Sequence, residues 1–429
     1  MSAPETTHAT ASTPESASEA KPATPLNSAR NPVVYVDSLE LLRSVVAELD
    51  AKGSGPLAVD AERASGFRYS QAAYLIQLHR RGSLVALIDP QAALQEDAAK
   101  AELRDFMAKH TWILHASTQD LPCLNELGLE PPALIDTELG SRLVGLPRVG
   151  LGAVVEHYLG LKLAKEHSAV DWSTRPLNQD WLVYAALDVD VLPELADRLI
   201  ADLQANGKLE IAQQEFAHLV RFRPKEKKQD RWRGTTGAHD IKSQRGLAIL
   251  RELWNAREVL AQKLDVAPGR LIPDASISIA AKSTYRSKSE LIGDRGFHGR
   301  ASRTYIDTWW AAIQAGTNTN DLPPLKLPHT GMPNHRLWSS KWPLAAERLK
   351  LAREHMAKIA ERMQMPVENL LTPDFLRQLC FSFDEIGTDA IEPFLRELGA
   401  RDWQIALLAG SESTGPSLGS VLASATLPD

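Results

Sequence analysis

Short apolar runs alternate with stretches of helical periodicity from about residue 33 to residue 205. Apolar runs bounded by turn residues are typical of strands, and apolar positions that recur every three to four residues are typical of helices. The predicted strands are Val33–Val36, Leu57–Asp60, Leu84–Ile88, Trp112–His115 and Ala133–Ile135, and the predicted helices lie near 39–51, 92–109, 138–146, 151–159 and 178–204. This alternation predicts an α/β domain over residues 32–205, in which helices cover a central sheet.

Beyond residue 205 the pattern becomes mostly helical and contains an internal repeat. Ala256-Arg257-Glu258 recurs 96 positions later from Ala352, and Pro273-Asp274 recurs 100 positions later from Pro373. Because the spacing grows by four residues, about one helical turn, we expect a longer helix in the second copy. The predicted parts are a connector at 206–240, all-α domains at 241–317 and 342–410, and a proline-rich linker at 318–341.

Both ends of the chain are poor in large apolar side chains. Residues 1–31 consist mainly of Ala, Thr, Ser, Pro and Glu, so they bury too little surface to offset the entropy of ordering. They also lack the apolar segment of a secretory signal and the acid-poor composition of a mitochondrial presequence. We therefore predict a disordered tail at 1–31 and a flexible tail at 411–429.

Charge is unevenly distributed along the 429 residues, whose formal net charge is −6. Residues 221–303 contain 19 Lys and Arg against 9 Asp and Glu, so the rest of the chain is acidic. A basic segment in an otherwise acidic chain favours a polyanionic partner, which one part of the protein would bind while another part processes it.

Several classes of protein are excluded or disfavoured. No apolar run approaches the roughly 20 residues of a membrane helix, so we expect no membrane partner. The two cysteines, Cys123 and Cys380, are far apart and lack metal-ligand spacing, which disfavours a disulfide scaffold or a zinc finger and favours the reducing cytoplasm. No nucleotide-binding P-loop occurs, so we expect neither a helicase nor a nucleotide cofactor. A monomer is the expected state.

Paired carboxylates end one of the predicted strands. In Leu57-Ala58-Val59-Asp60-Ala61-Glu62, the two acids are at positions i and i+2 and therefore point to the same face. Like charges this close repel each other unless a cation lies between them. An exposed strand end would also explain the pair, so it is only a weak signal by itself.

Further acids follow in a second strand and a helix. Asp120 comes shortly after the apolar strand that ends at His115, and Tyr184 and Asp188 share one face of a predicted helix at i and i+4. Four carboxylates and a phenol suit a site for two divalent metal ions, which clamp the attacking and leaving oxygens of a phosphodiester. Oxygen ligands favour Mg²⁺ or Mn²⁺.

In their order along the chain, these motifs resemble those of the DEDD superfamily of 3′→5′ exonucleases, in its tyrosine-bearing branch. The motifs are Val59-Asp60-Ala61-Glu62 with Leu75-Ile76-Gln77-Leu78, then His115-Ala116 to Asp120-Leu121, then Tyr184-Ala185-Ala186-Leu187-Asp188. Asp171-Trp172-Ser173 and Arg175-Pro176-Leu177 are more narrowly similar to the ribonuclease D group. The two repeated helical segments resemble HRDC domains. Together these similarities cover about residues 33–410.

The resemblance implies a ribonuclease H-like mixed α/β sheet domain followed by two all-α HRDC-like domains. It also implies hydrolysis of RNA 3′ ends, tRNA precursors among them, to nucleoside 5′-monophosphates. By analogy Asp60 would bridge two metal ions, Glu62 and Asp188 would hold the ion that activates water, Asp120 would support the other, and Tyr184 would position the water. Arg63, where this group usually has a bulky apolar residue, and the segment 64–73 depart from the family pattern, which puts contacts to the terminal nucleotides in doubt.

Six residues outside the acidic set are candidates for contact with nucleic acid: Gln77, His115, Lys165, Arg231, Trp232 and Arg233. Lysine and arginine would bind phosphates without reading sequence, and Trp232, which lies among arginines, would stack on a base.

Two other functions stay open. A DNA-directed 3′→5′ exonuclease would use the same site chemistry, and a catalytically silent RNA-binding protein would keep the fold. Retention of all four acids and Tyr184 favours an enzyme.

Overall fold

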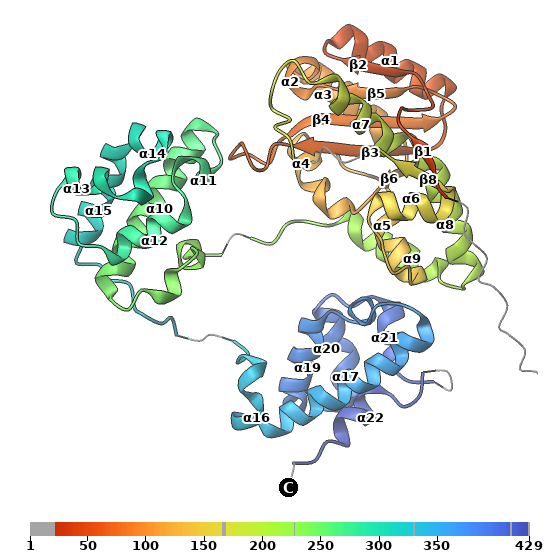
Figure 1. Ribbon diagram of the computed structural model, residues 1–429. Coiled ribbons are helices and arrows are strands. Elements are labelled where there is room, and N and C mark those ends of the chain that lie inside the picture. The colour runs from red at the N-terminus through yellow and green to blue at the C-terminus, as the bar shows by residue number, and fades with distance from the viewer. Residues whose placement is uncertain (1–21, 165–168, 227, 329–330, 412–413, 428–429) are drawn as a thin grey trace, which may run out of the picture.

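The computed structural model describes residues 22–164, 169–226, 228–328, 331–411 and 414–427, which form an α/β domain and two helical domains (Figure 1). A six-stranded mixed sheet with the strand order β2-β5-β4-β3-β6-β7 forms the centre of the α/β domain. Its strands are β2 (Val33–Val36), β3 (Ser54–Arg63), β4 (Ala73–Arg81), β5 (Val85–Ile88), β6 (Trp112–Leu114) and β7 (Leu134–Asp136). β4 runs antiparallel to both of its neighbours, and the other pairs are parallel.

Helices cover both faces of this sheet, as the alternating pattern predicted. The helices of the domain are α1 (Leu39–Lys52), α2 (Pro90–Ala93), α3 (Asp97–Met107), α4 (Leu121–Glu126), α5 (Thr137–Val144), α6 (Leu151–Leu159), α7 (Gln179–Asp190), α8 (Leu192–Ala205) and α9 (Leu209–Val220). Leu57 and Val59 of β3 pack in one core cluster with residues of α1 and α3, whereas Ala58 packs in another with Ala185 and Val189 of α7. Because side chains alternate along a strand, Asp60 lies on the α7 side together with Ala58.

The sheet contains one long strand that the apolar pattern missed. β4 is buried at every position except its last, so it shows none of the polar alternation that marks a half-exposed strand. The predicted helix at 178–204 is in fact two helices, α7 and α8, which meet at Val191. Pro193 stands at the first turn of α8, where a missing N–H costs nothing.

The prediction of a disordered tail was wrong for residues 22–31, while residues 1–21 lie outside the described part of the chain. β1 (Thr24–Leu26) pairs in parallel with β8 (Leu161–Leu163) in a two-stranded sheet. Arg30 and Asn31 then donate hydrogen bonds to the buried carboxylate of Asp190, at 3.0 and 2.6 Å. Partners some 160 residues away therefore order this polar segment.

The first helical domain follows a connector and has its own core cluster, centred on the longest helix. Its elements are η2 (Arg231–Gly234), η3 (Ala238–Asp240), α10 (Gln244–Leu264), α11 (Pro268–Leu271), α12 (Asp274–Lys282), α13 (Lys288–Gly293), η4 (Arg295–Phe297), α14 (Arg300–Thr304) and α15 (Ile306–Asn318). Asp274 accepts a hydrogen bond of 2.7 Å from buried Arg257 and lies in the first turn of α12, directly after Pro273.

The second helical domain repeats the beginning of the first. Its elements are η5 (His335–Leu337), α16 (Trp338–Lys341), α17 (Pro343–Met363), α18 (Val367–Leu370), α19 (Pro373–Ile386), η6 (Thr388–Ala390), α20 (Ile391–Glu397), α21 (Asp402–Leu408) and α22 (Leu418–Ala423). Both α10 and α17 have 21 residues and end at a left-handed residue, Asp265 (φ 48°) or Gln364 (φ 47°). The copies are offset by 99 residues, so α17 is not longer than α10 and the recurring Ala-Arg-Glu triplets do not occupy equivalent positions. The longer helix of the second copy is α19, with 14 residues against 9 in α12.

The chain beyond residue 410 is also more ordered than predicted. Within 411–429, Leu418 and Leu422 of α22 are fully buried in the same core cluster as Met356 of α17. The prediction of a flexible tail is therefore wrong for α22. No helix among the residues that the structure describes has the length and apolar character to cross a membrane.

Candidate active site at the end of strand β3

The carboxylates at the end of β3 line a cavity of about 660 Å³ in the α/β domain. Asp60 lies opposite Gln77 of β4 in the antiparallel register, and a bulge between Glu62 and Arg63 ends the regular pairing. Such bulges re-aim side chains at strand ends. Glu62 is only 8% exposed although it carries a carboxylate.

Helix α7 brings Tyr184 and Asp188 to the same cavity. Asn178 caps the helix by accepting from the N–H of Asp180, which fixes where the helix begins. Ligand oxygens of Asp60, Glu62 and Asp188 all lie within 4.8 Å of one another. The structure therefore brings together, from two distant segments, three of the four predicted acids.

Asp120, the fourth acid, also lines the cavity and is 6% exposed. The turn before it is held by Asp136, whose carboxylate accepts the N–H groups of Ala116 and Ser117 at 3.2 and 2.8 Å. Ala116 adopts a left-handed conformation, φ 58°, which is unfavourable for a residue with a Cβ and is characteristic of functional sites.

Burial dominates the electrostatics of these acids. It raises the pKa of Asp60 to about 6, and it raises the pKa values of Glu62 and Asp120 well above their usual range with help from the neighbouring carboxylates. Arg63, which also lines the cavity, opposes these shifts. Burial likewise raises the pKa of the Tyr184 phenol, with the charges of Asp188 and Glu62 adding to it, so this phenol is protonated at neutral pH.

The donor set fits divalent cations. All the candidate ligands are carboxylate oxygens, which hard ions such as Mg²⁺ and Mn²⁺ prefer. Glu62, Asp120 and Asp188 are buried beside Asp60, so the fold holds carboxylates together against desolvation and mutual repulsion, which bound cations would relieve.

Gln77 has a different place from the one predicted for it. It is fully buried, so contact with nucleic acid is excluded, and its Nε2 donates to Oδ2 of Asp60 at 3.2 Å. Gln77 therefore orients a carboxylate of the site. His115 does line the cavity, with Nδ1 2.9 Å from the hydroxyl of Thr137, and its contact with nucleic acid stays a prediction.

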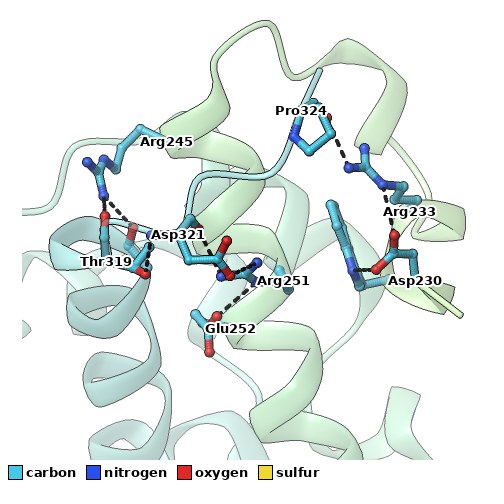
Figure 2. Close-up of polar contacts among 10 residues, drawn as sticks. Asp230, Arg233, Arg245, Arg251, Glu252, Thr319, Asp321 and Pro324 are labelled. Carbon is cyan, nitrogen blue, oxygen red and sulfur yellow. Dashed lines mark hydrogen bonds and ion pairs between the residues drawn. The ribbon is translucent and has the colours of Figure 1, made fainter. Parts of the chain in front are cut away.

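The basic and aromatic residues of the connector are mostly engaged within the protein. Trp232 is 4% exposed in the core of the first helical domain, so the predicted base stacking was wrong: a tryptophan among arginines has the same pattern in a core and on a stacking surface. Figure 2 shows Arg233 directed at Asp230 and at the carbonyl of Pro324, 2.9 Å away. Arg231 pairs with Glu258 at 3.5 Å. Lys165 lies outside the described residues.

The structure gives a place to one residue of the cavity wall and to one arginine outside it that the sequence could not provide. Phe67 lines the cavity although it belongs to the segment that departs from the family pattern. Arg175 is paired with buried Asp89 at 2.6 Å and donates to the carbonyl of Tyr74 at 2.8 Å, which ties the segment before α7 to the sheet. Neither position can be predicted from the neighbouring sequence, because both depend on residues that are distant along the chain.

Comparison with known families divides the chain into three parts. A family model described as 3′-5′ exonuclease matches residues 33–204, an HRDC domain model matches 246–313, and a model described as 3′ to 5′ exonuclease C-terminal domain matches 331–413. The HRDC description thus falls on the first helical domain. A second HRDC-like domain stays a prediction that rests on the structural repeat.

Individual relatives agree with this division. Ribonuclease D of Escherichia coli K12 is 33% identical over 65% of this chain and 75% of its own length, and that of Zymomonas mobilis is 30% identical over 71% and 77%. A solved protein from Bifidobacterium adolescentis, 37% identical, superposes with a TM-score of 0.83 over 94% of this chain and all of its own. The structure of E. coli RNase D has a TM-score of 0.61 at 25% identity over 85% of this chain and 99% of its own. The chain belongs to the ribonuclease D family of metal-dependent 3′–5′ exoribonucleases.

Proposed function

We propose that this enzyme trims the 3′ ends of structured RNA, tRNA precursors among them, releasing nucleoside 5′-monophosphates. The observation that carries the proposal is the cavity at the end of β3, where Asp60, Glu62 and Asp188 converge within 4.8 Å beside Asp120 and Tyr184. The solved relative from E. coli is described as an exoribonuclease involved in structured RNA processing, which supports the substrate class.

The carboxylates would hold two divalent ions, with Asp60 shared between them, Glu62 and Asp188 on one ion and Asp120 on the other. Such ions supply a nucleophilic water and neutralise charge on the phosphate during in-line displacement. Neighbouring residues hold the carboxylate side chains that would bind these ions. Gln77 donates a hydrogen bond to one oxygen of Asp60, and Asp136 accepts hydrogen bonds from the turn that positions Asp120.

Tyr184 would orient the attacking water. Because its phenol is protonated at neutral pH, it acts as a hydrogen-bonding group and not as a base. Tyr184 packs against the core cluster that contains the fully buried Trp172, and the centroids of the two rings are 6.5 Å apart.

The body of the RNA would bind along the basic surface of the first helical domain. Four arginines of this domain are exposed and form no ion pair among the residues that the structure describes: Arg286, Arg295, Arg300 and Arg303. Exposed arginines of this kind bind phosphates with strong dependence on salt and without sequence preference. A monomer in the cytoplasm is the expected working form, and both cysteines are buried free thiols.

The test is incubation of the purified protein with an end-labelled tRNA that carries a 3′ extension, with Mg²⁺, with Mn²⁺ or with EDTA, beside DNA of the same sequence. Stepwise shortening of the RNA from its 3′ end, with either ion and not with EDTA, is expected. Faster shortening of the DNA would show that DNA, and not RNA, is the preferred substrate. Binding without shortening would indicate an RNA-binding protein and contradict the proposal.

A further inference from the structure

The segment between β3 and β4 reaches across to the first helical domain (Figure 1). This segment contacts the C-terminal end of α10. The Asp265 carboxylate accepts hydrogen bonds from the N–H of Ser70 at 2.8 Å and from the hydroxyl of Tyr74, in β4, at 3.3 Å. The N–H of Ala267 donates to the carbonyl of Phe67 at 2.9 Å. The helical domain is therefore bound to the segment that forms part of the catalytic cavity wall.

One side chain of the helical domain touches this wall at two points. The Nε of Arg270, in α11, donates to the carbonyl of Gly66 at 2.7 Å. Its guanidinium carbon lies 4.0 Å from the centroid of the Phe67 ring. Gly66 and Phe67 both line the cavity that contains Asp60 and Asp188. Arg270 thus fixes the backbone and the ring of a wall residue from another domain.

An aromatic ring with an arginine on its face is suited to receive a base. Base–aromatic stacking is tolerant of sequence, and guanidinium–ring contact restricts the ring to one orientation. Phe67 is half-buried, packs against the core cluster that includes Ala185 of α7, and lines the cavity five positions after Glu62. A nucleotide whose phosphate lies at the carboxylates would have its base within the same cavity.

We propose that Phe67 stacks on the base of the 3′-terminal nucleotide and that Arg270 of the first helical domain is a positioning residue that holds Phe67 in place. The helical domain then completes the nucleotide pocket in addition to holding the RNA body. The inference rests on the proposed function, since it assigns a substrate contact to that same cavity. It places the contact to the terminal base on two residues 203 positions apart.

The experiment compares two short RNAs, a tetranucleotide that ends in adenosine and the same one with an abasic 3′ residue. For the adenosine substrate, kcat/KM is expected to fall about tenfold in Phe67→Ala and about threefold in Arg270→Ala. The double variant is expected to be no slower than Phe67→Ala, because one residue acts through the other. For the abasic substrate the variants should equal the wild type, because there is no base to stack on.

The abasic substrate also shows that each variant is folded with an intact metal site. Lys263→Ala is the matched control, an exposed cation of the same domain that lies outside the cavity and outside the arginine surface proposed for the RNA body. Equal losses on both substrates, or additive losses in the double variant, would overturn the assignment. So would a loss in Arg270→Ala confined to long RNA, which would make Arg270 a phosphate contact. Failure of the wild type to shorten either RNA would instead contradict the proposed function.

Discussion

Each helical domain contacts the α/β domain through the C-terminal end of its longest helix, but the two helices reach different sites on the α/β domain and form different interactions there. In each, the longest helix ends at a left-handed residue that contacts the α/β domain, Asp265 in one copy and Gln364 in the other. Asp265 contacts the segment beside the catalytic cavity. The carbonyl of Gln364 instead accepts from the buried ammonium of Lys208, at 3.1 Å, away from the acids.

The second contact is also the more deeply buried. Glu215 of α9, 6% exposed, accepts from Arg401 at 2.6 Å and from the indole of Trp403 at 2.7 Å. Apolar residues of the second helical domain and of the α/β domain belong to one core cluster, whereas the first helical domain has a cluster of its own. The comparison indicates that one copy of the repeat stabilises the enzyme and that the other shapes its substrate pocket.

Removing the buried acid is the strongest way to break the stabilising contact. Glu215→Ala leaves a guanidinium and an indole without their acceptor, so we expect a loss of about 3 kcal/mol in the free energy of unfolding. Chemical denaturation would measure it, with Glu210→Ala, an exposed acid of the same helix, as the control. A variant as stable as the control would contradict the structural role of this interface.

The equivalent change at the first domain should have a small effect on stability. Asp265→Asn keeps a side chain that tolerates the left-handed conformation but weakens the contacts to Ser70 and Tyr74. We expect a loss of about 1 kcal/mol or less in the free energy of unfolding, with a measurable loss of kcat/KM on the adenosine-ended tetranucleotide. A stability loss as large as that of Glu215→Ala would remove the difference between the two contacts.

The acidic site itself should destabilise the metal-free protein. Because the pKa values of Asp60, Glu62 and Asp120 are raised on folding, the folded state keeps protons that the unfolded state releases. Their stabilising contribution is complete below the unfolded pKa values near 4 and is lost as pH rises through the folded ones, about 6 for Asp60.

In EDTA at pH 8, Asp120→Asn should therefore raise the melting temperature by about 2 °C, as expected for roughly 1 kcal/mol in a protein of this size. Saturating Mg²⁺ should stabilise the wild type more than the variant, since binding favours the folded state that has its full ligand set. Thermal unfolding with and without the ion measures both effects. A variant that melts lower than the wild type in EDTA would show that these carboxylates are not strained in the metal-free protein.

The sequence could predict features that depend on spacing within one helix or strand, and it could not predict contacts between residues that are far apart along the chain. Asp60 with Glu62, and Tyr184 with Asp188, have fixed spacings on a strand and a helix, so their shared faces follow from periodicity. Their convergence depended on the family resemblance, because no local pattern joins residues 60 and 188. β4 was missed because burial on both faces removes its alternation, and the ordering of residues 22–31 depends on Asp190.

The contacts between domains had no sequence signal. Phe67 and Arg270 look like an ordinary loop aromatic and a surface cation, and Trp232 among arginines looked like a stacking residue although it is core. In each case the chemistry is set by which partner the fold brings close, not by the residues around it in sequence.

The central claim is that the carboxylates at the end of β3 perform the hydrolysis, and Asp60→Asn tests it most directly. The substitution keeps the shape of the side chain and can still bond to Gln77, but it removes the negative charge that we propose would be shared between two metal ions. The account predicts that Asp60→Asn binds 3′-extended tRNA as tightly as the wild type and shortens it at least a thousandfold more slowly, a loss of about 4 kcal/mol in transition-state stabilisation. Shortening at a rate near that of the wild type would contradict it.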